Sequence, residues 1–230
     1  MTIYRAVAAV VVISLIACGG VVAEPTLNGY TGLLTVPTAD TLEAGTFNIG
    51  ANSGEVEDWD NFSYYANFGL GEETEAGLIL FRPDNGVDSQ VSSASVRGRS
   101  GDQTFLNIKR SISAVDGGPD IAAGVFDLAD EVETTVYVVA TWEQGDEVGT
   151  VDGRTVNFLD VHAGFAGGMI EDFFAGVNLA FGTRVQVMGE FINDDVNIGA
   201  RFSPLDNITV DAGLLDMDDL AVNVSYDSTY

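Results

Sequence analysis

The only histidine of the chain, His162, is the first candidate for chemistry. It follows Asp160 by two residues, and alternate residues of a strand share one face, so the imidazole and the carboxylate would lie side by side. Such a pair could serve a nucleophilic serine as its general base. No serine occurs in a recognisable nucleophile-elbow motif, however, and a lone interior histidine is more often a hydrogen-bonded filler. We therefore expect no enzyme activity and no catalytic residue.

Metal chemistry is the second possibility, because acidic runs occur at 55–60, 127–133 and 216–219. Oxygen ligands at such density can bind calcium. Their spacing fits no calcium-loop template, and the sequence has no cluster of cysteine and histidine. We expect solvated acidic turns, with no metal site and no cofactor.

A third set of charged residues falls on the small, polar faces of predicted strands. Basic residues lie on the early strands and most acids on the later ones. In a closed, narrow barrel they could meet across the lumen and seal it with ion pairs; in a wider barrel they would set a transverse field along a water-filled channel. We favour the sealed network, because about twelve strands leave limited room. The residues predicted to face the lumen are Arg97, Arg99, Lys109, Glu143, Asp160, His162, Glu190, Arg201 and Asp211.

The elements that would position these residues show period-two alternation and no convincing helical period after residue 43. The stretch 62–70 is an example: five apolar residues share one face, and Ser63, Tyr65, Asn67 and Gly69 share the other. Thirteen such runs lie at 44–52, 61–70, 74–82, 91–99, 103–110, 120–128, 134–143, 156–166, 171–181, 184–193, 196–203, 207–214 and 219–228.

The composition of the two faces decides the fold class. The polar faces carry mostly Gly, Ala, Ser, Asn and Thr, which suit a crowded lumen, whereas the opposite faces carry the aromatic and branched residues that lipid contact requires. A sheet that spans lipid must close on itself. The sequence therefore predicts an all-β fold: one closed antiparallel transmembrane β-barrel of about 12 strands, within a range of 10–14, over residues 44–230. The alternative is a secreted β-sandwich, for example a glycan-binding one.

Strand number and loop lengths give the expected topology. Bacterial barrels have even strand numbers, so one of the thirteen runs is in excess; fourteen strands would require 30–36 to be a strand as well. The first gaps alternate between long and short, as in barrels with long outer loops and short periplasmic turns. With the first gap outside, the amino terminus lies in the periplasm.

The large excess of acidic residues limits the kinds of partner that the protein can bind electrostatically. The chain has 35 Asp and Glu against 9 Lys and Arg, which excludes nucleic acid and anionic lipid surfaces as electrostatic partners. A hydrophobic content of 46% argues against disorder.

The amino-terminal residues predict export. Arg5 precedes an uncharged run at 6–17 that has the length of a signal-peptide core. A signal peptide of residues 1–23 is one processing option. The other is a signal of residues 1–17, because Leu15 to Cys18 resembles a lipobox in which Cys18 becomes lipidated. Cys18 is the only cysteine, so the mature chain has no disulfide.

Residues 24–43 form a segment rich in turn-forming residues. Its candidate turn residues are Gly29, Tyr30, Gly32, Pro37, Thr38 and Asp40. Thr38 and Asp40 could cap a short helical turn that runs to Glu43. The segment is expected either to pack at the periplasmic mouth of the barrel as a plug or to be a plain linker.

The order Gly-Tyr-Thr-Gly-Leu-Leu-Thr-Val-Pro-Thr-Ala-Asp from Gly29 to Asp40, followed by Leu42 and Gly45-Thr46, resembles the opening of the YjbH-like family. The resemblance covers about 25 residues. It implies an outer-membrane β-barrel, in some members a lipoprotein, that is linked to exopolysaccharide production.

These observations favour a barrel in the outer membrane of a Gram-negative bacterium, with a structural or accessory role in envelope or exopolysaccharide export. A small outer-membrane porin is the alternative. The last strand alternates and ends on the aromatic Tyr230, as in strands that the barrel insertion machinery recognises. The expected partners are outer-membrane lipid, that machinery, and exopolysaccharide or its export proteins.

Overall fold

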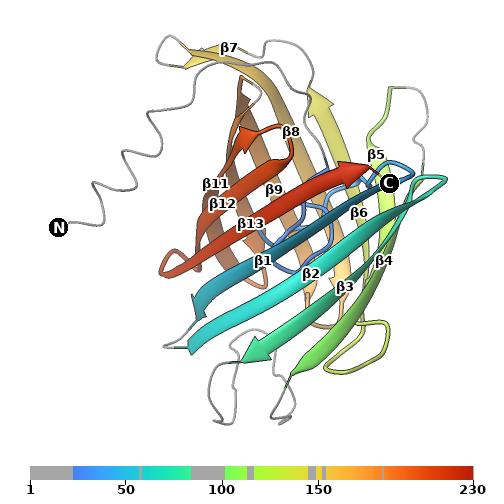
Figure 1. The fold of residues 1–230 in the computed structure, drawn as a ribbon. Helices are drawn as coiled ribbons and strands as arrows, with labels where there is room; N and C mark the ends of the chain where they lie inside the picture. The colour runs from blue at the N-terminus through green and yellow to red at the C-terminus, as the bar shows by residue number, and fades with distance from the viewer. Residues whose placement is uncertain are drawn as a thin grey trace.

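Twelve antiparallel strands form the wall of the protein, as seen in a computed structural model (Figure 1). The structure describes residues 23–56, 59–83, 102–112, 117–144, 149–151, 154–182 and 184–229. The wall strands are β1 (Thr46–Val56), β2 (Trp59–Gly71), β3 (Thr74–Pro83), β4 (Gln103–Ile112), β5 (Asp120–Phe126), β6 (Thr135–Gln144), β8 (Arg154–Gly167), β9 (Asp172–Phe181), β10 (Val185–Ile192), β11 (Asp195–Leu205), β12 (Ile208–Leu215) and β13 (Asp219–Thr229). A further short strand, β7 (Gly149–Val151), pairs only with β8.

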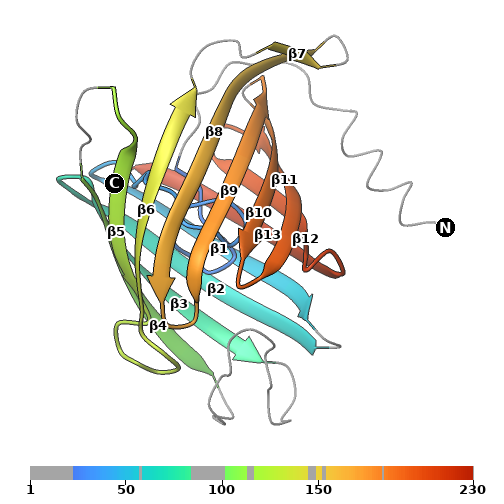
Figure 2. The ribbon, with the colours of Figure 1, turned by 180° about the vertical axis from the view of Figure 1, so that it is seen from behind.

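The barrel closes through two sets of pairings, which the two opposite views show (Figures 1 and 2). The first strand, β1, pairs with the last, β13, in a register that runs from Thr46↔Thr229 to Gly54↔Ala221. On the other side β6 pairs with β8. Every wall strand therefore has two neighbours, and the expected closed barrel of twelve strands is confirmed.

One of the thirteen predicted runs, 91–99, lies outside the described residues. Strands β3 and β4 pair directly from Thr74↔Arg110 to Phe81↔Gln103. No place for an intervening strand remains between them.

Apolar side chains point outward and small polar ones inward, because alternate residues of a strand face opposite sides. On β2, Phe62, Tyr64 and Phe68 are exposed, and Phe68 keeps 42% of its surface accessible. Ser63 and Asn67, between them, are buried. This arrangement excludes the sandwich alternative, in which the aromatic face would be buried between two sheets.

The expected sorting of long and short loops to opposite ends is wrong. Strands β3 and β5 both end at one end of the barrel, where the eight-residue connection between β5 and β6 begins. Strand β7 lies at the other end, the end at which β1 begins and β13 ends (Figure 1). The error arose from the extra run at 91–99, which reversed the inferred direction of every later strand. Among the described residues, no helix is long and apolar enough to cross a membrane.

Candidate functional site: the filled lumen

Residues 24–43 lie inside the barrel rather than at its mouth (Figure 1). Their apolar side chains are buried: Tyr30, Leu34 and Val36 keep 1% of their surface or less. We call this segment the plug. The chain enters near the ends of β12 and β13, where Glu24 contacts Thr209 and Ser225. It leaves at the same end of the barrel, where the Gly45 N–H donates to the carbonyl of Gly69 on β2.

The plug is a set of tight turns held by its own backbone. Two isolated antiparallel bridges, Pro25↔Thr31 and Gly32↔Pro37, fold it back on itself. The Tyr30 hydroxyl donates to the carbonyl of Thr35 at 2.8 Å, and burial raises the pKa of that hydroxyl well above its ordinary value. Gly29 has a φ of +80°, and a Cβ there would lie 2.6 Å from Ile79 Cγ1, so both the turn and the wall require glycine.

The helical turn expected from Thr38 to Glu43 does not form. The Thr38 hydroxyl donates to the Asp40 side chain instead of capping a helix. The backbone donors are taken by the wall: the Ala39 N–H donates to Thr141 Oγ1 at 2.9 Å, and the Leu42 N–H donates to Glu75 Oε2 at 3.1 Å. Contacts with the barrel therefore override the local capping preference.

The first of three charged anchor points for the plug is the pair Glu75 and Lys109 on β3 and β4. Their side chains are almost fully buried, and Lys109 Nζ lies 3.4 Å from Glu75 Oε1. Glu75 Oε1 accepts hydrogen bonds from the Thr31 N–H at 3.1 Å and the Thr31 hydroxyl at 2.6 Å. Lys109 donates to the carbonyls of Thr31 and Thr38 at 2.9 and 3.3 Å. One ion pair of the wall thus binds both donors and acceptors of the plug.

The second anchor point is Glu190 on β10. Its carboxylate accepts the backbone N–H groups of Leu34, Thr35 and Val36 at 2.7, 2.9 and 3.0 Å. The Thr35 hydroxyl donates to its other oxygen at 2.7 Å, and Asn197 Nδ2 donates at 3.2 Å. Three successive N–H groups form an anion-binding concavity of the kind called a nest. No lysine, arginine or histidine of the described chain forms a salt bridge with Glu190.

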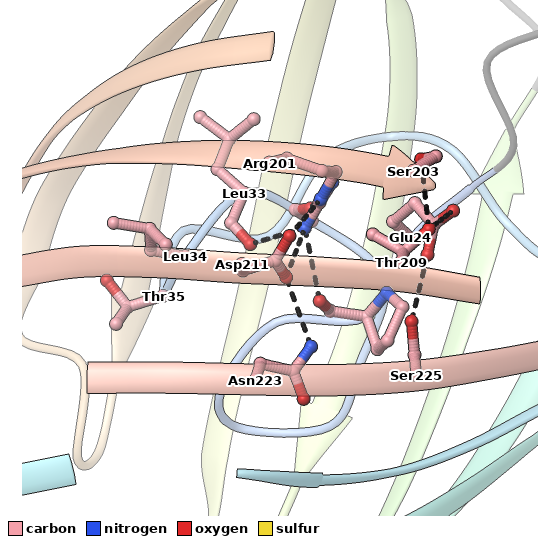
Figure 3. Close-up of polar contacts among 12 residues, drawn as sticks. Glu24, Leu33, Leu34, Thr35, Arg201, Ser203, Thr209, Asp211, Asn223 and Ser225 are labelled. Carbon is pink, nitrogen blue, oxygen red and sulfur yellow. Dashed lines mark hydrogen bonds and ion pairs between the residues drawn. The ribbon is translucent and has the colours of Figure 1, made fainter. Parts of the chain in front are cut away.

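The third anchor point is Arg201 on β11 (Figure 3). Its guanidinium forms a salt bridge with Asp211 on β12, with Nε 2.8 Å from Oδ1. It also donates to three plug carbonyls, those of Pro25, Gly32 and Leu33, each at 3.2 Å.

Glu24, which lies near Arg201, begins the plug. It accepts hydrogen bonds from the Thr209 and Ser225 hydroxyls at 2.8 and 3.3 Å (Figure 3). Burial raises the pKa of its carboxyl, while the positive charge of Arg201 opposes that shift.

Glycines on the inner face of the wall leave space for Leu33 and Leu34 of the plug. A Cβ added at Gly176 would lie 2.5 Å from Leu33 Cδ1. One added at Gly199 or Gly213 would lie 2.6 or 2.5 Å from Leu34 Cδ1. The small residues of the inner face therefore make room for the plug as well as for each other.

His162 takes part in a hydrogen-bonded chain that joins it to Asp160 through Asn178. Its Nδ1 lies 2.9 Å from Thr141 Oγ1, which also accepts the Ala39 N–H of the plug. Its Nε2 lies 2.8 Å from Asn178 Oδ1, and Asn178 in turn donates to Asp160 at 3.1 Å. The histidine thus links the plug to the wall. No nucleophilic serine takes part in this chain of contacts.

The structure places the predicted lumen residues as follows. Lys109, His162, Glu190, Arg201 and Asp211 are buried on the inner face. Asp160 is half-buried, and Glu143, at the end of β6, is exposed. Arg97, Arg99, Cys18 and residues 1–22 of the predicted signal peptide lie outside the described residues.

For the charged residues that the structure describes, the expected pairing across the lumen is wrong. Both buried ion pairs join directly opposed residues of neighbouring strands, Glu75↔Lys109 and Arg201↔Asp211. The plug occupies the space between the walls, and no ion pair among the described side chains crosses it.

Sequence reasoning missed Glu75, Glu24 and Thr141 among the residues that hold the plug. Glu75 had a usable signal: it alternates with Gly77 and Ile79 on the inner face of a predicted strand. Glu24 had none, because it stands beside the expected cleavage site and outside every strand.

Comparisons with known proteins bear on the fold. No family model and no curated protein matches the chain, and the resemblance to the YjbH-like family stays a prediction. Among solved structures, the KdgM porin is similar with a TM-score of 0.50 and 7% identity, over 80% of this chain and 99% of that one. The Acinetobacter baumannii outer membrane protein Omp33 gives 0.44 and 8%, over 80% and 98%. An outer membrane channel from Pseudomonas putida F1 gives 0.38 and 11%, over 86% and 100%.

At sequence identities this low, the similarity indicates the fold of the chain and not its activity. A closed strand wall with an apolar exterior is the form in which β-structure crosses lipid. The chain is thus a twelve-stranded β-barrel of the bacterial outer membrane.

Proposed function

We propose that the protein is a sealed outer-membrane barrel, with its plug as the closing element, and that its role is structural or accessory. The observation that carries the proposal is the anchoring of residues 24–43 by buried charges on both halves of the wall, at Glu75 and Lys109 and at Glu190 and Arg201. A twelve-stranded wall is wider than its own side chains fill. The plug supplies the missing volume.

Conductance tests this proposal directly. The purified full-length protein, inserted into planar bilayers, is expected to give no steady open steps. Proteoliposomes are expected to retain small sugars as well as empty liposomes do, with flotation as the control for insertion. Steady steps in the unmodified protein would instead establish the small porin, which the similarity to the fold of the KdgM porin also suits.

An accessory role in exopolysaccharide export is the finer part of the proposal. Its support is that Gly29 to Asp40, the residues that carry the resemblance to the YjbH-like family, lie within the plug. Deletion of the gene in its native host is expected to lower surface polysaccharide, measured by dye binding and by sugar analysis of the cell exterior. A complementing copy with intact plug residues should restore the amount. Unchanged polysaccharide in the deletion strain would refute this role and leave the sealed barrel untouched.

A further inference from the structure

We infer that the barrel passes cations in preference to anions once the plug withdraws, and that Glu190 sets this preference. The inference rests on the proposed function, since it takes the plug as the element that closes the lumen. It adds a substrate class and a selectivity-determining residue.

The first step is to separate charges that remain paired from charges that do not. Lys109 and Arg201 each contact a carboxylate of the neighbouring strand, Glu75 at 3.4 Å and Asp211 at 2.8 Å. Both members of each pair belong to the wall, so the pairs persist when the plug leaves. The two charges of each pair largely cancel, so the pair adds little net charge to the lumen.

Glu190 differs because its main partners are part of the plug. The N–H groups of Leu34, Thr35 and Val36 and the Thr35 hydroxyl leave together with residues 24–43. Only Asn197 remains as a donor, at 3.2 Å. Withdrawal of the plug therefore exposes a negative charge that forms no salt bridge with any cationic side chain that the structure describes.

The surroundings of Glu190 leave it open to the lumen. Its directly opposed neighbours are Gly176 on β9 and Asn197 on β11, one without a side chain and the other short and neutral. Two further carboxylates of the wall, Asp160 and Asp227, are half-buried and form no salt bridge with a described cation. Among the wall side chains that the structure describes, the buried or half-buried charges without an ion-pair partner are thus carboxylates.

Unpaired wall charges of one sign determine which ions enter a pore. Low-dielectric walls focus the field of such charges, and rings of acidic side chains select cations in channels. At physiological salt the field reaches about 8 Å, comparable with the half-width of a barrel of this size. Cations are therefore expected to be the permeant species.

The test opens the full-length chain in two independent ways. The substitution Gly176→Leu places a side chain where Leu33 of the plug lies, since a Cβ there already comes within 2.5 Å of Leu33 Cδ1. Moderate urea in the bath releases the plug of the unmodified protein. The reversal potential in a KCl gradient then gives the ratio of cation to anion permeability. The ratio should be well above one, and Glu190→Gln in the same background should lose most of that preference.

The matched control is Glu171→Gln, which removes the same charge from an exposed position outside the lumen and should leave the ratio unchanged. A ratio of one or less, or a ratio insensitive to Glu190→Gln, would overturn the inference. So would silence under both opening methods, because the plug would then be permanent; the sealed barrel would stand. Steady conductance of the unmodified protein without urea would refute the proposed sealed barrel. The ratio of cation to anion permeability, compared with that of Glu190→Gln, would still test the role of Glu190.

Discussion

Replacing Arg201 with methionine is expected to lower the free energy of unfolding by about 3–5 kcal/mol. The guanidinium is buried together with Asp211 and donates to three plug carbonyls. Methionine fills a similar volume but leaves the Asp211 carboxylate without its cation. Urea unfolding in detergent micelles, followed by the gel shift between boiled and unboiled samples, measures the change.

The exposed pair Arg82 and Asp102 provides the comparison for Arg201. Its side chains keep 60% and 66% of their surface accessible, so solvent screens the attraction. Arg82→Met should change the free energy of unfolding by at most about 1 kcal/mol. If Arg201→Met were equally mild, the third anchor point would not stabilise the plugged barrel.

Gly176→Leu is expected to convert a silent barrel into a conducting one. The new side chain and Leu33 cannot occupy the same volume, and overpacking of this kind costs about 1–3 kcal/mol. The barrel wall is a continuous hydrogen-bonded sheet on both sides of Gly176, so we expect the plug to yield rather than the wall. Planar-bilayer recordings should show steady open steps, and limited proteolysis should cleave within residues 24–43.

Two further variants separate a displaced plug from general damage. Gly189→Leu makes the same change on the neighbouring strand, at a position whose nearest Cβ contact is Val177 at 3.7 Å, and should stay silent. The double variant Gly176→Leu with Leu33→Ala restores the space and should close the barrel again. Conductance that persists in the double variant would indicate that the wall, and not the plug, had been disturbed.

The wall of this protein could be predicted from the sequence, because lipid contact on one side and a polar lumen on the other impose a strict period of two. The run at 62–70 shows this in full: Phe62 and Phe68 face out, Ser63 and Asn67 face in. The direct pairing of β3 with β4 shows the limit of such a prediction. Alternation is necessary for a strand but does not determine its partners, and only the register of β3 on β4 decides which runs join the wall.

The candidate site was harder to predict, because its geometry depends on contacts between residues far apart in the chain. The turn residues from Gly29 to Asp40 mark a compact segment, yet nothing local places Leu34 beside Glu190. The glycines of the inner face could have indicated a filled lumen. Gly176, Gly199 and Gly213 leave space inside the wall that serine or asparagine side chains would have occupied.

The path of the plug also constrains how the protein can be made. Leu34 is bound by Glu190, 156 residues later, and Gly32 by Arg201, 169 residues later. The plug, which precedes every wall strand in the sequence, must therefore wait for hairpins synthesised near the end of the chain. Strands β1 and β13 then have to pair while the plug is already inside the barrel. Substitutions that weaken the anchor points should consequently appear in cells first as poor delivery to the membrane, before any change in the finished protein is seen.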